Sequence, residues 1–428
     1  TYQQAVLPGW SDTFCGEPTG NGRIAMELNS GLMIIEAVAA GLGIGELPIH
    51  MAPQYPDLVR IWPHRSEPYD LWLVMPSDSP FHDGWWFRNE FIIPESWKEK
   101  NITLHFDGIN YAANIWLNGV QIAGQDTVRG MFRRFEFPVT DKLLYGRANA
   151  VAVEIFAPGL IEDKDYHTKQ VEATVGWDDH NPQPPDRSMG IWQPVYLTAE
   201  GPLSLKNPYV ETHLDIPSLD SATLTLSAVI RNNTSNPVDG TLEAVIENIA
   251  LKQKISLGPG ESREYFFRPE EYPELTLQHP RVWWPHPLGP QELYDLSMTL
   301  TAGTAISDTA KVRFGIREIS SSLNEEDWRY YQVNGKRVLI RGGAWMNSDM
   351  LFNLSHNRYE ALVRYAREAN LNMLRSEGFS IRETDDFYNL CDEMGIMVTQ
   401  QLFGRSIADE PLAIACVEDT LSRIRNHP

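Results

Sequence analysis

The sequence predicts a multidomain, mainly β protein in which two β-sandwiches precede a run of β-α-β units. The chain has 428 residues, which is more than one domain of about 150 residues holds. Short segments that alternate apolar and polar residues recur between turn signals from about residue 85 to residue 301. Beyond Phe314 the hydrophobic period changes, and strands alternate with amphipathic helices. A short α/β segment is expected at the N-terminus.

Composition excludes several classes of protein. Lysine and arginine number 36 and aspartate and glutamate 57, so the formal charge is 36 − 57 = −21. That balance argues against a nucleic-acid binder, which needs a basic face. No apolar run reaches the roughly 18 residues that a membrane span requires. The hydrophobic content of 42% predicts a folded, soluble chain, and it leaves open whether the compartment is cytoplasmic, periplasmic or secreted.

The first predicted segment, residues 1–79, begins with an irregular stretch rich in glycine and proline. An apolar run with helical spacing, Leu32–Ala40, then meets the glycine-rich turn Gly41–Gly45, which indicates an α/β rhythm. Residues 21–79 resemble the C-terminal part of the effector-binding domain of LysR-type regulators, through NGRIAMELNSGLMIIEAVAAGLGIGELP and PDLVRIWPHRSEPYDLWLVMPSD. The resemblance includes no DNA-binding helix-turn-helix. We expect a fragment of that domain.

Residues 80–201 are predicted to form the first sandwich, because alternating strands follow one another between tight turns. The turn Asn118-Gly119 is a hairpin signal. The expected strands are Trp85–Phe91, Ile102–Phe106, Ala113–Leu117, Phe132–Phe137 and Ala150–Phe156.

Residues 202–315 are predicted to form a second, immunoglobulin-like sandwich, from their size and polar turns. Trp283 and Trp284 are expected to pack between this sandwich and the segment that follows it. The expected strands are Thr223–Arg231, Gly240–Glu247, Gln253–Leu257, Glu264–Arg268 and Tyr294–Thr301.

Residues 316–428 are predicted to contain three β-α units with right-handed parallel connections. The expected strands are Arg337–Arg341, Leu371–Arg375 and Gly395–Gln400. Helices are expected near Arg358–Glu368, Thr384–Met394 and Pro411–Ile424.

Several stretches resemble glycoside hydrolase family 2 and cover about Pro80 to Pro428. The most specific are WWFRNEFIIPESWKEKNITLHFDGINYAANIWLNGVQIA, VGWDDHNPQPPDRSMGIWQPVYL, VWWPHPLGPQELYDL, YYQVNGKRVLIRGGAWMNSDML and NMLRSEGFSIRETDDFYNLCDEMGIMV. Within the family the sequence looks most like the exo-β-glucosaminidases and the related β-mannosidases. The resemblance implies a sugar-binding jelly roll, an immunoglobulin-like sandwich and an incomplete (β/α) TIM barrel. It also implies retaining, exo-acting hydrolysis of β-linked glycosides or oligosaccharides.

Candidate substrate-binding residues follow from the rule that reactive groups of a β/α barrel lie at the carboxyl ends of its strands. The rule selects Trp345 and Asp349 after the first strand and Arg375 and Glu377 at the second. Glu377 could hold a sugar amino group if the substrate is a glucosaminide. An alternative is that Arg375 and Glu377 form a salt bridge that braces the strand end. Further candidates after the third strand are Gln400, Gln401 and Arg405.

The first sandwich is implied by the resemblance to contribute Asp186 and Trp192 to the same site. Asp186 and the neighbouring Asp178, Asp179 and His180 could also be read as oxygen and nitrogen ligands of a calcium ion. A solvated loop with local turns is favoured over a metal site. The three cysteines show no metal-ligand spacing. No metal or other cofactor is therefore predicted.

The catalytic carboxylates of a retaining glycosidase are expected beyond Pro428. In the family the acid/base follows shortly after a motif like RIRNHP, here residues 423–428, and the nucleophile lies later still. Three units also cannot close an eight-stranded barrel. We therefore expect a fragment that is inactive as given. One alternative is a noncatalytic carbohydrate-binding fragment. Another is a fragment of an effector-sensing regulator, which the formal charge of −21 and the lack of a DNA-binding helix-turn-helix argue against.

Overall fold

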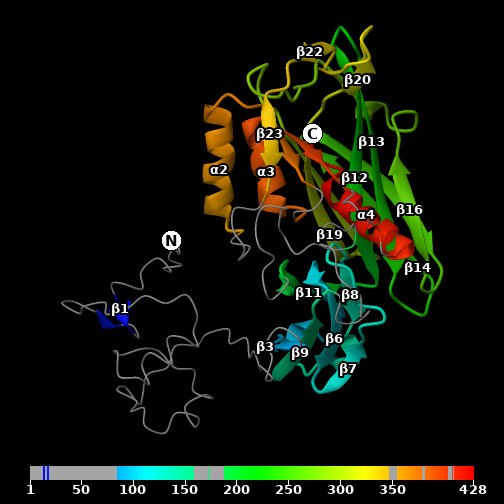
Figure 1. The fold of residues 1–428 in the computed structure, drawn as a ribbon. Helices are drawn as coiled ribbons and strands as arrows, with labels where there is room; N and C mark the ends of the chain where they lie inside the picture. The colour runs from blue at the N-terminus through cyan, green and yellow to red at the C-terminus, as the bar shows by residue number, and fades with distance from the viewer. Residues whose placement is uncertain are drawn as a thin grey trace, which may run out of the picture. The chain divides into compact units, whose positions relative to one another are not determined.

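The protein is described by a computed structural model that divides into two compact units, at Leu71 and Trp72. The structure describes residues 13–14, 17–18, 84–158, 172, 188–346, 354–377, 381–402, 407 and 409–428. In the first unit, the described part is the antiparallel pair of β1 (Thr13–Phe14) and β2 (Glu17–Pro18). The α/β segment expected from the sequence lies outside the described residues. The second unit is mainly β and contains all the described helices (Figure 1).

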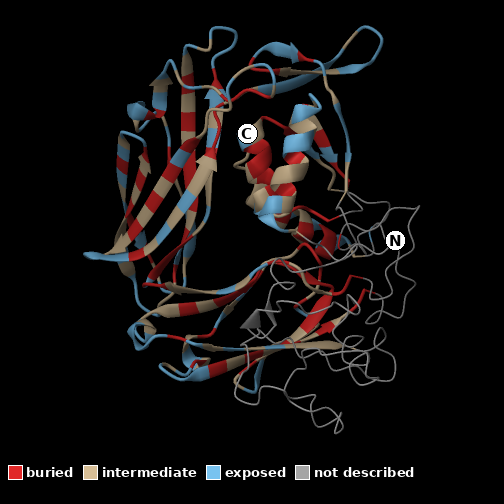
Figure 2. Ribbon diagram, turned by 90° about the vertical axis from the view of Figure 1, so that its left-hand side faces the viewer, coloured by how far each residue is buried: buried red, intermediate tan, exposed pale blue. Residues whose placement is uncertain are grey.

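The second unit begins with a sandwich of two antiparallel sheets. One sheet has the order β3-β9-β6-β7, the other β11-β4-β8, and β5 pairs with β10 beside them. In β9, buried residues alternate with more exposed ones, as a half-buried strand requires (Figure 2). The two inner faces share one core that contains Phe106, Ile115 and Ile155. The strands are β3 (Trp85–Ile92), β4 (Asn101–Phe106), β5 (Ile109–Asn110), β6 (Ala112–Leu117), β7 (Val120–Ala123), β8 (Phe135–Pro138), β9 (Ala148–Phe156), β10 (Gly190–Ile191) and β11 (Val195–Glu200).

A second sandwich of two four-stranded antiparallel sheets follows. Its sheets are β12-β13-β16, with β17 paired to β13, and β15-β14-β18-β19. Gly240 lies where the two sheets approach closely, since a Cβ there would stand 2.7 Å from Leu203 Cδ1 on β12 of the other sheet. The strands are β12 (Leu203–Leu214), β13 (Ser221–Asn232), β14 (Val238–Ile246), β15 (Ile249–Leu257), β16 (Ser262–Phe267), β17 (Thr276–Gln278), β18 (Tyr294–Ala302) and β19 (Ala305–Phe314).

A three-stranded antiparallel sheet, which the sequence did not predict, connects this sandwich to a parallel sheet. It consists of β20 (Ile319–Leu323), β21 (Arg329–Val333) and β22 (Lys336–Val338). The parallel sheet then has the order β23-β24-β25. Of the strand expected at Arg337–Arg341, only the first two residues are in a strand, the antiparallel β22, and the first parallel strand, β23, begins one residue after the expected range. The elements of the parallel region are β23 (Gly342–Trp345), α2 (His356–Glu368), β24 (Met373–Ser376), α3 (Asp385–Met394), β25 (Met397–Gln400) and α4 (Glu410–Ile424).

The helix ends follow the local sequence. Helix α3 ends at Gly395, whose φ of 72° is the left-handed conformation that favours glycine. Helix α4 begins after Asp409, whose side chain accepts a hydrogen bond from the Leu412 amide, and it has a proline in its first turn. These caps explain why both helices lie close to their predicted positions. None of the helices in the described part of the chain is long and apolar enough to cross a membrane.

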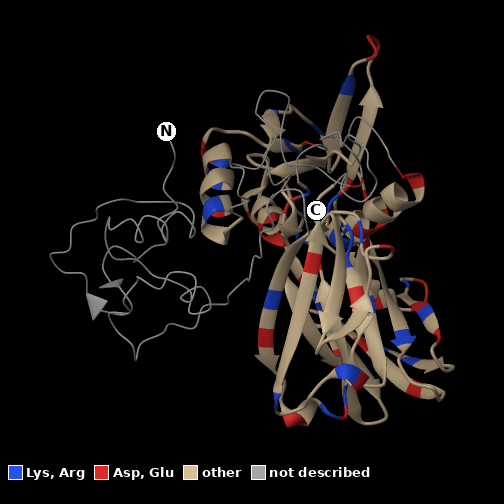
Figure 3. Ribbon diagram, turned by 60° about the horizontal axis from the view of Figure 1, so that its bottom comes forward, with Lys and Arg blue, Asp and Glu red and all other residues tan. Residues whose placement is uncertain are grey.

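Ion pairs join the first sandwich to α4. Arg133 Nε donates to Asp419 Oδ2 at 2.7 Å, and the Arg134 amide donates to the same oxygen at 3.1 Å. Arg129 pairs with Asp409 at the start of the helix. Elsewhere, Figure 3 shows acidic and basic positions interspersed along the described strands. The first sandwich and α4 are therefore held by specific charged contacts.

Replacing Asp419 by Asn should lower the free energy of unfolding by about 1–2 kcal/mol, because it removes the charged acceptor of two hydrogen bonds that are about three-quarters shielded from solvent. Urea denaturation measures the change. The matched control is Glu418→Gln on the same helix, whose side chain is exposed. Equal losses in the two variants would contradict the assigned role of Asp419.

Candidate substrate-binding site

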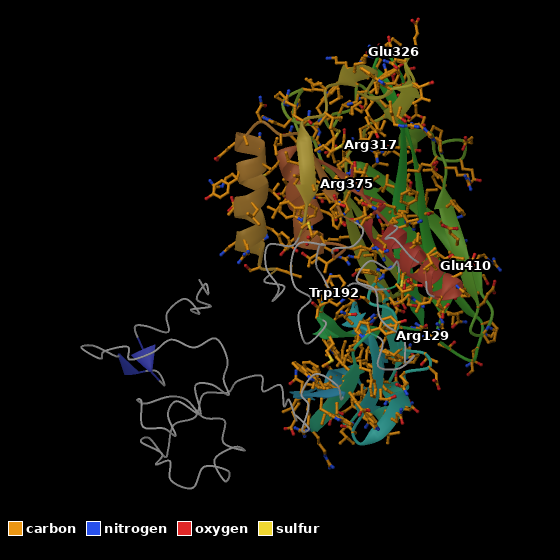
Figure 4. All side chains as sticks on the ribbon, viewed as in Figure 1. Arg129, Trp192, Arg317, Glu326, Arg375 and Glu410 are labelled. Carbon is orange, nitrogen blue, oxygen red and sulfur yellow. The ribbon has the colours of Figure 1, made fainter. Side chains whose placement is uncertain are left out.

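Three polar side chains meet at the carboxyl end of the parallel sheet. Arg375 lies on β24, Glu377 follows that strand, and Gln401 follows β25. Arg375 Nη1 donates to Glu377 Oε1 at 2.6 Å, and its Nη2 donates to Gln401 Oε1 at 2.7 Å. Carboxyl ends of neighbouring parallel strands lie at one edge of the sheet, which explains why these residues converge. Figure 4 labels Arg375 at this edge.

The backbone fixes the position of Glu377. Its amide donates to the Trp345 carbonyl at 3.2 Å, which continues the β23–β24 ladder by one residue. The Gln401 amide similarly donates to the Ser376 carbonyl at 3.0 Å. The three polar groups are therefore attached to the ends of paired strands, where their positions vary less than on a free loop.

The charges of the cluster differ in their exposure. The Glu377 side chain is 6% exposed, whereas that of Arg375 is 52% exposed. Arg375 occupies one carboxylate oxygen of Glu377, and Oε2 has no hydrogen-bond donor among the described residues. A shielded carboxylate with one oxygen available can accept hydrogen bonds from hydroxyls or from an ammonium group. The exposed guanidinium can donate to further oxygens of the same ligand.

The backbone of Trp345 is next to this cluster, but the side chain of Trp345 lies on the other face of the sheet. It is in register with Ser376, whereas Arg375 is in register with Ala344. Because adjacent side chains of a strand point to opposite faces, the indole lies toward the helices. There its ring centroid is 4.7 Å from that of Phe387. The structure therefore places Trp345 beneath the Arg375–Glu377 pair, against α2 and α3.

The Trp345 indole is bonded to a buried carboxylate that the sequence did not single out. Trp345 Nε1 donates to Glu383 Oε1 at 2.8 Å, and the Tyr359 hydroxyl donates to Glu383 Oε2. Glu383 is 1% exposed. Burial raises the pKa of Glu383 to about 7, against the opposing effect of the Tyr359 and Trp345 hydrogen bonds. Burial likewise raises the pKa of the Tyr359 hydroxyl.

Trp192 is separate from the Arg375–Glu377 pair. Its Nε1 donates to the Met131 carbonyl at 3.0 Å, and its ring meets Phe132 edge to face with centroids 6.0 Å apart. Trp192 lines a small cavity between the first sandwich and α4. The charged residues that line this cavity include Arg382 and Asp419. Figure 4 shows Trp192 and Arg375 in different parts of the unit.

Three of the predicted site residues, Asp186, Asp349 and Arg405, lie outside the described residues, as does the loop considered for calcium. Within the part of the chain that the structure describes, no group of three or more histidine, cysteine, aspartate or glutamate side chains could hold a metal ion.

A second cavity, of about 260 Å³, lies where β12 and β19 meet the residues that follow α4. Its charged lining includes Arg317 and Arg425 but also Glu211 and Glu318. Burial lowers the pKa of Arg317. The opposing charges favour no particular ligand, and the sequence had not indicated this cavity.

Family models match three parts of the chain. A model described as glycosyl hydrolase 2 galactose-binding domain-like matches residues 81–193, and one described as glycosyl hydrolases family 2 matches residues 203–317. A model of the LysR substrate binding domain matches residues 3–83. Both resemblances expected from the sequence are confirmed by these matches.

Related proteins and solved structures agree with the first two models. The chain is 33% identical over 364 residues to an exo-β-D-glucosaminidase of Streptomyces avermitilis, covering 81% of this chain and 39% of the relative. It is 30% identical to a mannosylglycoprotein endo-β-mannosidase of Lilium longiflorum, covering 83% and 40%. The crystal structure of the Amycolatopsis orientalis exo-chitosanase superposes with a TM-score of 0.72 at 28% identity, covering 82% and 40%.

The β-D-mannosidase of Dictyoglomus thermophilum superposes with a TM-score of 0.68 at 27% identity, covering 81% of this chain and 44% of that one. The chain thus spans about two fifths of the length of the curated relatives it matches. Through residues 81–317, the chain belongs to glycoside hydrolase family 2.

Proposed function

We propose that residues 80–428 are the substrate-binding part of a retaining, exo-acting β-glycosidase of the β-glucosaminidase type. In this proposal residues 80–201 are a sugar-binding jelly roll, residues 202–315 an immunoglobulin-like sandwich, and residues 316–428 the first three units of a TIM barrel. The family membership and the parallel sheet with its intervening helices support this arrangement.

The observation that carries the proposal is the cluster of Arg375, Glu377 and Gln401 at the carboxyl end of the parallel sheet. Glu377 offers a shielded carboxylate oxygen beside its bond to Arg375, and this oxygen can accept a hydrogen bond from an ammonium group. Charge-assisted hydrogen bonds of this kind are stronger than neutral ones. The Arg375 guanidinium can donate hydrogen bonds to neighbouring hydroxyls of the sugar, and the Gln401 side-chain amide can bond to them as well. An amino sugar matches this set better than a neutral sugar does.

The chemical step requires two further carboxyl groups. Retaining glycosidases use an acid/base and a nucleophile about 5 to 5.5 Å apart. We infer from the family resemblance that both lie outside the given sequence, and that this chain contributes binding and orientation of the terminal sugar. Asp349, Asp186 and Trp192 remain proposed as further substrate-binding residues, and Trp345, also expected there from the sequence, is proposed to act on the site from the opposite face of the sheet. This chain by itself would bind and orient the sugar but would not cleave it.

A β-mannosidase type is the second candidate, because the relatives include β-mannosidases. A mannoside carries a hydroxyl where a glucosaminide carries an amino group, so it would gain less from the Glu377 carboxylate. The role of Glu377 therefore distinguishes the two candidates.

Titration calorimetry of the 428-residue chain with a β-linked glucosamine disaccharide and with the matching mannose disaccharide tests the proposal. We expect binding of the glucosamine disaccharide and weaker binding of the mannose disaccharide. A chromogenic β-glucosaminide at high protein concentration should show no turnover above the buffer rate. Preference for the mannoside would favour the second candidate, and binding of neither would refute a sugar site here. Turnover would refute the inferred position of the catalytic carboxylates.

A further inference from the structure

Glu383 connects elements that are distant in the sequence. Its carboxylate accepts hydrogen bonds from Trp345 at the end of β23 and from Tyr359 on α2. Its backbone carbonyl accepts a hydrogen bond of 2.5 Å from Arg423 on α4. Glu383 itself lies two residues before α3 begins. One buried residue is therefore bonded to three of these elements and adjoins a fourth.

Trp345 connects Glu383 to the proposed sugar-binding cluster of Arg375, Glu377 and Gln401. The Trp345 indole donates to Glu383, and the Trp345 carbonyl accepts the amide hydrogen of Glu377. The indole also packs against Phe387 on α3. The position of Trp345, and through it that of Glu377, thus depends on the buried carboxylate. Without Glu383, the indole N–H would be left without its acceptor in a largely apolar setting.

We propose that Glu383 is a positioning residue for substrate binding: its hydrogen bond to the Trp345 indole fixes the carboxyl end of β23 and thereby holds the Glu377 carboxylate in place for the sugar. The inference rests on the proposed function, because it assigns the positioned group a role in sugar binding. A neutral amide at residue 383 can accept from the indole and meet the Tyr359 hydroxyl as a donor, because a hydroxyl can reverse its role. Shape and hydrogen bonding therefore matter more than charge.

The test compares Glu383→Ala and Glu383→Gln in the full 428-residue chain. Calorimetric affinity for the glucosamine disaccharide should fall about tenfold in the alanine variant, the scale of one lost hydrogen bond to a charged group. It should recover to within about threefold of the unaltered chain in the glutamine variant. The matched control is Asp392→Asn, which alters another buried carboxylate, one bonded to His427 at 2.6 Å and not to Trp345. Its affinity should be unchanged.

A spectroscopic measurement is independent of sugar binding. In protein labelled with 5-fluorotryptophan, the ¹⁹F resonance of Trp345, one of 13 tryptophans, is identified by its loss in Trp345→Phe. We expect this resonance to shift in Glu383→Ala, and to shift less in Glu383→Gln and in Asp392→Asn.

The outcomes separate the inference from the proposed function. An unmoved Trp345 resonance in Glu383→Ala would overturn the positioning role whether or not sugar binds. Equal losses of affinity in Glu383→Ala and Asp392→Asn would overturn it too, because they would show a general loss of stability. Failure of the unaltered chain to bind the disaccharide would overturn the proposed function, and with it the part of the inference that concerns sugar.

Discussion

Replacing Glu377 by Gln should weaken binding of the glucosamine disaccharide by about 10- to 100-fold, the range expected when a charged hydrogen-bond partner becomes neutral. The effect should be large because the Glu377 side chain is only 6% exposed, so little solvent screens its interaction with an ammonium group. Binding of the mannose disaccharide should change by less than about threefold, because its hydroxyl carries no charge and so loses no ion pair when the carboxylate becomes an amide. Titration calorimetry with both sugars measures the difference.

A matched control for this substitution exists on α3. Glu393 also pairs with an arginine, Arg313, at 2.6 Å, but away from the carboxyl end of the sheet. Glu393→Gln should leave both affinities unchanged while removing a glutamate–arginine pair whose carboxylate, at 47% exposed, is more open to solvent. If Glu377→Gln weakened both sugars equally, the carboxylate would be bracing the strand end and not selecting an amino group. That result would favour the salt-bridge alternative considered from the sequence.

Salt dependence provides a second check on the same carboxylate. Because the proposed contact joins a carboxylate to an ammonium group at a shielded site, its contribution should fall only modestly between low and physiological ionic strength. A steep loss of affinity with salt would instead indicate binding through exposed charges elsewhere on the protein.

The convergence of Arg375 and Glu377 could be predicted from the sequence because it depends on a local pattern and a general rule. Alternating strands and helices indicate a parallel sheet, and residues two apart at a strand end share one face. The face of Trp345 could not be predicted in the same way. It depends on the register between β23 and β24, and a shift of one residue would move the indole to the opposite face.

Long-range burial explains the other differences. Glu383 receives hydrogen bonds from Trp345 and Tyr359, which are 38 and 24 residues away along the chain. The hydrophobic periodicity of a single helix or strand cannot indicate contacts over such distances in the sequence. Strand β20 was missed because all its residues are exposed, so it lacks the apolar alternation by which a half-buried strand is recognised. The ten strands expected in the two sandwiches overlap observed strands, most of which have one buried face, whereas others, among them β11, β12 and β19, were not predicted.

The largest effect on stability is expected for Trp283→Ala, with a loss of about 3–5 kcal/mol in the free energy of unfolding. Trp283 is fully buried and packs with Val333, Val338 and Met397. Its Nε1 donates to the Asp392 carbonyl on α3 at 2.9 Å, and its own carbonyl accepts from Asn334 Nδ2 at 2.9 Å. Truncation would open a cavity and leave the Asp392 carbonyl without this partner. Urea denaturation followed by circular dichroism measures the loss.

Two variants separate packing from hydrogen bonding at this position. Trp283→Phe keeps much of the ring volume and removes the N–H, so its loss should be smaller than that of the alanine variant. Trp328→Ala removes an indole that is 72% exposed and should change stability by less than about 0.5 kcal/mol. Trp283 connects the second sandwich to α3 and to the parallel sheet that carries Glu377. In limited proteolysis of Trp283→Ala, we therefore expect the first cuts to fall in the region C-terminal to Gly315, which contains that sheet. Cleavage that began within β12–β19 would show instead that the second sandwich depends on Trp283 more than the parallel sheet does.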